Sequence, residues 1–187
     1  MENLFYKWDS YFNKQELKKI SDTIEQKRNK QFEEVGAIAE GKKIKKTNTV
    51  AVEWLSIKPL MKRLDEALFV TNQDKYGYHL YNFLDCDTVL CNIYDAQQGH
   101  EYPWHKDGEK DGDKVCIKFT VLINASTEPY EGGQFQLFGN GGEINISEMD
   151  YPGCVIMFKS DIPHRVLPVT KGIRRSITIF MKGPHFV

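Results

Sequence analysis

The chain lacks long apolar runs and has almost no net charge. No apolar stretch approaches the ~18 residues that a membrane-spanning helix needs. The first residues, Met1–Leu4, lack the basic and apolar regions of a secretory signal. The 25 Lys and Arg residues are balanced by 26 Asp and Glu residues, which gives a formal net charge of -1. This balance excludes a protein that binds nucleic acid or membranes through bulk charge.

Cysteine is also scarce. The four cysteines are Cys86, Cys91, Cys116 and Cys154, and no two of them have C-x-x-C spacing. This pattern argues against a disulfide framework and against a cysteine-based zinc site. We expect reduced, mostly buried thiols in a cytoplasmic protein.

The composition is that of a folded protein, because 41% of the 187 residues are hydrophobic and 27% are charged. The length predicts a single domain, 1–187, with a helical support region at 1–77 and a core at 78–187. Asn13 and Glu16 form a capping-box pattern before a run with helical spacing. A second helix is predicted from near Ser56, with Pro59 in its first turn.

Residues 33–49 are predicted to form a loop that contains the basic run Lys42–Lys46. A charge run of this kind is usually a solvated surface, and the alternative is a rim that attracts an acidic substrate.

From about Tyr78 the pattern changes to short segments rich in β-branched and aromatic residues, separated by glycine-bearing turns. The predicted strands are Thr88–Tyr94, Val115–Asn124, Gln134–Phe138, Glu143–Ile146, Cys154–Phe158, His164–Val169 and Arg174–Met181. Most gaps between them are too short for helices, so a parallel α/β sheet is disfavoured. The pattern indicates a mainly β (α+β) fold, an antiparallel jelly roll or barrel with N-terminal helices packed on it.

His105 and Asp107 are two residues apart on a segment that we expect to be extended. Their side chains then point to the same face and can share a metal ion. An isolated His-x-Asp is a weak signal, because a chance pair with a solvated Asp is its default interpretation. His164, which follows the apolar strand Cys154–Phe158, supplies a second imidazole. Two imidazoles and one carboxylate form the facial triad that binds Fe(II) and leaves the opposite positions open.

Arg174 opens the last predicted strand, ten positions after His164, and shares one face with Ser176 and Thr178. A guanidinium in a protein interior requires an anion, because leaving it unpaired is costly. The carboxylate of a small dicarboxylic acid suits it, and Ser176 can add a hydroxyl donor. For Arg174 taken alone, pairing with a surface acid is the alternative.

Several spaced motifs between residues 78 and 182 resemble the prolyl 4-hydroxylase-type Fe(II)/2-oxoglutarate-dependent dioxygenases. They are Tyr94…Gly99…Tyr102…His105-x-Asp107, then Glu131-Gly132-Gly133, then Pro152-Gly153-x-Val155-x-x-Phe158, and then His164-x-Val166-x-Pro168 continuing to Gly172-x-Arg174-x-Ser176. The resemblance implies a double-stranded β-helix, a jelly roll with helices on its major sheet.

The resemblance also implies the site residues. His105, Asp107 and His164 would hold Fe(II), and Arg174 and Ser176 would bind the cosubstrate 2-oxoglutarate. Tyr94 matches a tyrosine beside that cosubstrate, and a core aromatic is the alternative. Relatives often place a hydroxyl where this chain has Leu122; either Thr120, on the same face, replaces it, or Arg174 and Ser176 suffice.

The implied reaction is hydroxylation of an unactivated C–H bond with O2, releasing succinate and CO2, with ascorbate as an optional accessory. The resemblance favours a prolyl residue of a peptide or protein as substrate. The site itself serves a free amino acid or other small molecule equally well, because fold and metal do not fix the substrate. Nucleic-acid demethylation and a metal-free binding module rank below these, and the oligomeric state is left open.

Overall fold

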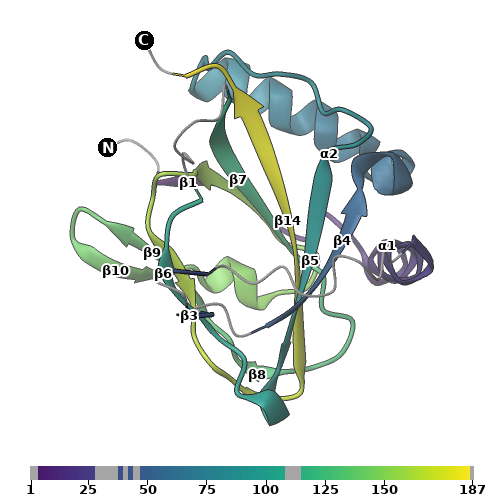
Figure 1. Ribbon diagram of the computed structural model, residues 1–187, viewed down its shortest axis with the longest axis vertical. Helices are drawn as coiled ribbons and strands as arrows, with labels where there is room; N and C mark the ends of the chain where they lie inside the picture. The colour runs from purple at the N-terminus through teal and green to yellow at the C-terminus, as the bar shows by residue number, and fades with distance from the viewer. Residues whose placement is uncertain (1–3, 28–37, 40–41, 44–46, 108–114, 186–187) are drawn as a thin grey trace.

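The computed structural model describes residues 4–27, 38–39, 42–43, 47–107 and 115–185 (Figure 1). The helices are α1 (Lys14–Lys27) and α2 (Trp54–Lys75), with 3-10 turns η2 (Ala96–Gln98) and η3 (Ser147–Asp150). The strands before residue 107 are β1 (Phe5–Trp8), β2 (Ile38–Ala39), β3 (Lys42–Lys43), β4 (Asn48–Glu53), β5 (Thr88–Asp95) and β6 (Tyr102–His105). Those after it are β7 (Cys116–Asn124), β8 (Glu131–Gly132), β9 (Phe135–Gly139), β10 (Gly142–Asn145), β11 (Val155–Lys159), β12 (His164–Val166), β13 (Val169–Lys171) and β14 (Ile173–Gly183).

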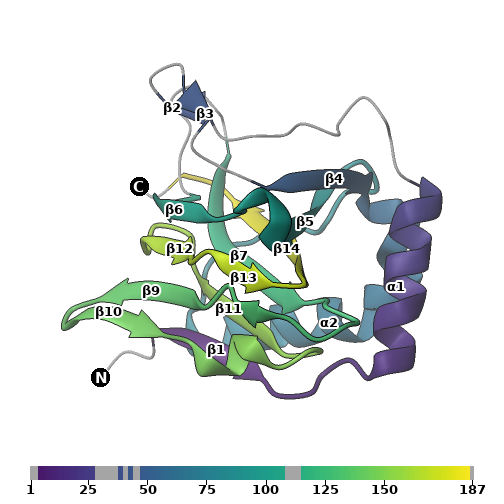
Figure 2. The ribbon, with the colours of Figure 1, turned by 90° about the horizontal axis from the view of Figure 1, so that it is seen from below.

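Two antiparallel sheets make the body of the protein. The larger has the strand order β1-β11-β7-β14-β5-β4, and the smaller has the order β10-β9-β12-β6. Figure 2 shows α1 at one side of the molecule and β9 and β10 at the other, with strands of the larger sheet between them. This is the predicted jelly roll, with helices packed on the larger sheet. No helix in the described ranges is both long and apolar enough to cross a membrane.

The helices pack on the larger sheet because their apolar residues repeat at helical spacing. Leu17, Ile20 and Ile24 of α1 are buried, as predicted from that spacing. The capping box is also confirmed, since Asn13 Oδ1 accepts from the amides of Gln15 and Glu16, and Glu16 Oε2 accepts from the amide of Asn13. These contacts fix where α1 begins.

Successive side chains of the larger sheet point to opposite faces, and each face belongs to a separate core. Val121, Ile177 and Ile179 point toward the helices and join the core that includes α1 and α2. On the opposite face of the same sheet, Leu122 and Phe158 meet residues of the smaller sheet. The space between the two sheets is therefore lined by every second residue of the larger sheet.

The N-terminal region differs from its prediction as a helical support. It contributes β1, which pairs with β11, and β4, which pairs with β5, so both edges of the larger sheet come from the first 53 residues. The predicted loop at 33–49 contains the short pair β2–β3 and the start of β4. Of the basic run, the backbone of Lys42–Lys43 forms β3, and residues 44–46 lie outside the described residues.

Two further boundaries shift. Helix α2 begins at Trp54, two residues before the predicted start, so Pro59 lies in its second turn. The predicted strand His164–Val169 is divided into β12 and β13, which belong to different sheets. Leu167 and Pro168 form the step between them, and a proline without an amide hydrogen suits such an interruption.

Candidate metal and cosubstrate site

The ends of β6 and β12 bring the two predicted histidines together. These strands are antiparallel neighbours, and His105 and His164 are directly paired across them. Asp107 lies two residues beyond His105, and its amide donates to the carbonyl of Ser160 at 3.0 Å. One potential ligand atom from each of the three residues lies within 4.8 Å of the others, so the cluster could hold a metal ion.

Backbone carbonyls set the orientation of both imidazoles. Nδ1 of His105 lies 2.8 Å from the carbonyl oxygen of Pro103, and Nδ1 of His164 lies 3.0 Å from that of Ile162. A carbonyl only accepts, so each Nδ1 carries the proton and donates it. The Nε2 atoms then face Asp107, at 3.8 Å from Oδ1 for His105 and 3.2 Å from Oδ2 for His164. In metal sites, histidine ligands are commonly oriented in this way, by a hydrogen bond from the ring nitrogen that does not bind the metal.

Asp107 is held in its ionised form. Burial opposes ionisation, but the hydrogen bond and charge of His164, the charge of His105 and the hydroxyl of Thr120 outweigh it, so the pKa of Asp107 is lowered. The Thr120 hydroxyl donates to Asp107 Oδ2 at 2.8 Å, and Thr120 is fully buried. The structure therefore places Thr120, which the sequence assigned to the cosubstrate, on the carboxylate of the candidate metal site.

Aromatic rings enclose the histidines. Tyr102 stacks on His105 with ring centroids 3.5 Å apart and an interplanar angle of 19°. Phe158 meets the edge of His164 at 4.9 Å, and Phe135 lies 5.8 Å from it. These rings restrict the imidazole positions and limit water around the cluster.

Arg174 lies on the inner face of β14, directly paired with Tyr94 of β5. It is only 1% exposed, and its three guanidinium nitrogens have no hydrogen-bond partner among the described residues. Its Cζ lies 5.5 Å from the centre of the Tyr94 ring. A buried guanidinium without an anion costs free energy, so this arrangement fits an anionic ligand such as 2-oxoglutarate.

Gly133 makes room for this arginine. It has φ of +67°, and a Cβ atom built on it would lie 2.8 Å from Arg174 Cδ. Gly132 is also at positive φ, as the glycine turn expected at Glu131-Gly132-Gly133 requires, but Glu131–Gly132 forms the short strand β8 instead of a turn. A larger residue at position 133 would displace the arginine.

Tyr94 and Ser176 lie beside Arg174 on the same inner face. Tyr94 is 2% exposed and Ser176 is 2% exposed. Burial raises the pKa of Tyr94 to about 12, although the charge of Arg174 lowers it, so the hydroxyl remains protonated. Tyr94 is paired with Arg174 across the two strands, and Ser176 is two residues from Arg174 on the same strand.

The sequence analysis missed two polar contacts near the site. It did not connect Thr120 with Asp107, and it gave no role to Asn92, which is 4% exposed on the inner face of β5. A signal for Asn92 was present, since it is two positions before Tyr94 and therefore shares its face.

The remaining buried histidine outside the cluster, His100, accepts from the amide of Asp95 at 3.0 Å.

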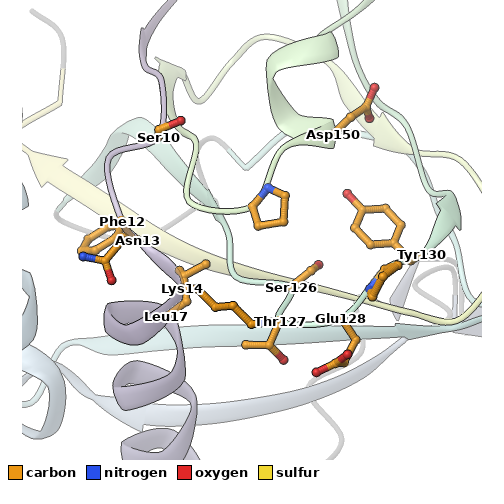
Figure 3. Close-up of a pocket in the computed structure, with 12 residues that line it drawn as sticks. Ser10, Phe12, Asn13, Lys14, Leu17, Ser126, Thr127, Glu128, Tyr130 and Asp150 are labelled. Atoms are coloured by element: carbon orange, nitrogen blue, oxygen red, sulfur yellow. The ribbon is translucent and has the colours of Figure 1, made fainter.

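A separate surface cavity of about 610 Å³ lies between the start of α1 and the segment 126–130. Figure 3 shows Phe12 and Asn13 on one side of it and Tyr130 and Asp150 on the other. None of the residues that line it belongs to the His-Asp-His cluster, and Arg174 is not among them. We therefore place the candidate site between the sheets and not in this cavity.

Solved structures with the same fold include several oxygenases. A prolyl-4-hydroxylase from Pseudomonas putida has a TM-score of 0.72 at 18% identity, covering 97% of this chain and 94% of the other. A prolyl hydroxylase from Trichoplax adhaerens, solved with a hypoxia inducible factor peptide, has a TM-score of 0.70 at 16% identity, covering 96% of this chain and 83% of the other. The carbocyclase SnoK from nogalamycin biosynthesis has a TM-score of 0.68 at 11% identity, covering 97% of this chain and 80% of the other. At these identities the likeness shows the fold alone.

No curated protein matches the sequence significantly. A sequence profile of the 2OG-Fe(II) oxygenase superfamily, where 2OG is 2-oxoglutarate, matches residues 89–182. That match covers half of the chain and contains the His-Asp-His cluster and Arg174. The chain therefore belongs to the 2OG-Fe(II) oxygenase superfamily.

Proposed function

We propose that this protein is an Fe(II)- and 2-oxoglutarate-dependent hydroxylase. His105, Asp107 and His164 would hold Fe(II), since they present two imidazole nitrogens and one carboxylate from one side. Arg174 would bind the far carboxylate of 2-oxoglutarate. The observation that carries the proposal is the buried guanidinium of Arg174, which has no partner among the described residues and lies in the interior that also contains the cluster.

The residues of the chain have distinct tasks in this proposal. Bound Fe(II) and 2-oxoglutarate supply, with O2, the oxidising power for hydroxylation, and succinate and CO2 are released. Thr120 keeps Asp107 in place, and the carbonyls of Pro103 and Ile162 hold the Nδ1 side of each imidazole, so that both Nε2 atoms face the position of the metal. The surrounding rings limit the access of water, which strengthens the electrostatic interactions inside the site.

Tyr94 and Ser176 would assist Arg174. Because burial keeps the Tyr94 hydroxyl protonated, it can donate a hydrogen bond to a bound carboxylate or keto oxygen. Ser176 can donate from the neighbouring position on β14. Ascorbate would act only from solution, and we assign no residue to it.

For the substrate we propose a prolyl residue in a peptide or protein, acted on in the cytoplasm. The support is the fold shared with prolyl hydroxylases, one of which was solved with a peptide. SnoK shares the fold at a similar TM-score, so a small molecule or a free amino acid is the second candidate.

The test is an assay of succinate release with Fe(II), 2-oxoglutarate and O2 over three substrate panels: proline-containing peptides, free amino acids and methylated oligonucleotides. We expect peptide-stimulated succinate and a mass gain of one oxygen on proline. His105→Ala should remove both signals. Stimulation only by free amino acids would replace the prolyl proposal, and absence of turnover in every panel would contradict a hydroxylase of these substrates.

A further inference from the structure

A line of hydrogen-bonded polar side chains crosses three neighbouring strands of the larger sheet. Thr49 Oγ1 on β4 donates to Asn92 Oδ1 on β5 at 3.0 Å, and Asn92 Nδ2 donates to Thr178 Oγ1 on β14 at 3.0 Å. The three residues are 1%, 4% and 6% exposed. A buried polar line of this kind is costly unless its groups are satisfied or used.

The strand register places this line on the face that lines the space between the sheets. Thr49 is paired with Asn92, and Asn92 with Ser176, which shares its face with Thr178. The alternate residues of β14, Ile177 and Ile179, belong to the core on the helix side. The polar line therefore belongs to the same interior as Arg174.

Thr178 lies between Arg174, at one end of the proposed site, and Thr120, which contacts the metal-site residue Asp107 at the other end. Along β14 it is four residues from Arg174, with Ser176 between them on the same face. Across to β7 it is paired with Leu122, while the next inward residue of β14, Phe180, is paired with Thr120, which bonds Asp107. Thr178 and Thr120 are thus diagonal neighbours on one face, about 7–8 Å apart between backbones.

The direction of the hydrogen bonds determines what Thr178 can do. The atom of Asn92 that faces Thr178 is Nδ2, which can only donate, while its oxygen accepts from Thr49. The Thr178 oxygen therefore accepts, and its own proton is not used in a hydrogen bond among the described residues. Leu122, opposite, offers no acceptor in its side chain.

We propose that Asn92, held by Thr49, orients the Thr178 hydroxyl so that it donates a hydrogen bond to an oxygen of 2-oxoglutarate bound between Arg174 and the metal. Thr178 is the contact, and Asn92 and Thr49 are positioning residues. The inference rests on the proposed function, since it needs 2-oxoglutarate in this interior. The alternative is that these three side chains have only a structural role and stabilise the edge strand β4.

The experiment is an anaerobic calorimetric titration of the Fe(II)-loaded protein with 2-oxoglutarate, which measures binding without turnover. We expect Thr178→Val to raise the Kd about tenfold, the loss of one hydrogen bond to a charged ligand. Thr178→Ser keeps the hydroxyl and should bind within about twofold of wild type. Fe(II) affinity, measured without 2-oxoglutarate, should be the same in all three proteins.

The role of Asn92 is tested by a double-mutant cycle. Asn92→Leu should raise the Kd for 2-oxoglutarate in the wild-type background and should have no further effect in the Thr178→Val background. If Asn92→Leu does not fold, Thr49→Val tests the same line, because it removes the bond that fixes the Asn92 amide.

Wild-type Kd in Thr178→Val, with only the melting temperature lowered, would show that the line is purely structural. Additive effects of Asn92→Leu and Thr178→Val would overturn the positioning role of Asn92. If wild-type protein itself fails to bind 2-oxoglutarate in the presence of Fe(II), the proposed function is overturned together with this inference. These outcomes are therefore distinguishable.

Discussion

The two faces of strand β14 carry opposite kinds of side chain. Toward the helices it presents Ile177, Ile179 and Met181, which belong to the larger core. Toward the smaller sheet it presents Arg174, Ser176 and Thr178, which are equally buried. Both faces are dry, so the difference is not one of exposure.

This comparison separates stability from chemistry within a single strand. Burial of the apolar face stabilises the fold by about 25 cal/mol for each Å² removed from water. The polar face destabilises the fold wherever a buried group has no hydrogen-bond partner, as at Arg174. Changes on the two faces should therefore have opposite consequences, and each of the following experiments tests that separation.

The largest effect on stability is expected from the helix-facing side. Ile179→Ala removes buried methyl groups from the core and should lower the free energy of unfolding by about 2–5 kcal/mol. Urea denaturation measures this, while the Kd for Fe(II) and for 2-oxoglutarate should be unchanged in the folded protein. Loss of ligand affinity together with stability would mean that the two faces cannot be separated.

Arg174→Met should act in the opposite direction. Removing an unpaired buried charge should raise the free energy of unfolding of the ligand-free protein by about 1–3 kcal/mol. The same change should raise the Kd for 2-oxoglutarate at least tenfold. Arg175→Met is the matched control on the other face, and it should leave that Kd unaltered. A less stable Arg174→Met protein would show that the guanidinium is already compensated.

Thr120→Val tests the contact between Thr120 and Asp107. Loss of the hydroxyl should weaken Fe(II) binding about tenfold, as for other groups that orient metal ligands, and Thr120→Ser should restore it. At saturating Fe(II), the Kd for 2-oxoglutarate should not change. The reverse result, weaker 2-oxoglutarate binding with normal Fe(II) binding, would support the sequence-based assignment of Thr120 to the cosubstrate.

The smallest effect concerns two buried thiols, Cys91 in the core on the helix side and Cys154 in the core between the sheets. Burial raises the pKa of Cys91 to about 12 and that of Cys154 to about 11. A thiol whose pKa is raised by folding keeps its proton in the native state, so stability should fall slightly as the pH rises above ~8.5. Native protein treated with iodoacetamide at pH 8 should be labelled at exposed Cys86 only, and urea should expose all four. Rapid native labelling of Cys91 would contradict a dry core.

Much of the fold and the cluster follows from local pattern. The spacing of His105 and Asp107 predicts a shared face, and the structure brings both next to His164. The predicted strands from residue 88 onward mostly agree with the structure within one or two residues, because alternation and glycine turns are local signals.

What sequence reasoning missed depends on pairing between distant strands. Strand β4 contains the β-branched Thr49, Val50 and Val52, but the predicted loop at 33–49 included its first two residues and no strand was predicted over 50–53. The contacts of Thr120 with Asp107, and of Asn92 with Thr49 and Thr178, depend on cross-strand register, which a single sequence does not specify.

The most direct measurement is an anaerobic absorption titration of the purified protein with Fe(II) and 2-oxoglutarate, run in parallel on His105→Ala. The account predicts a visible charge-transfer band that requires both additions in wild-type protein and is absent in His105→Ala. An unchanged spectrum in wild-type protein, or an equal band in His105→Ala, would contradict it.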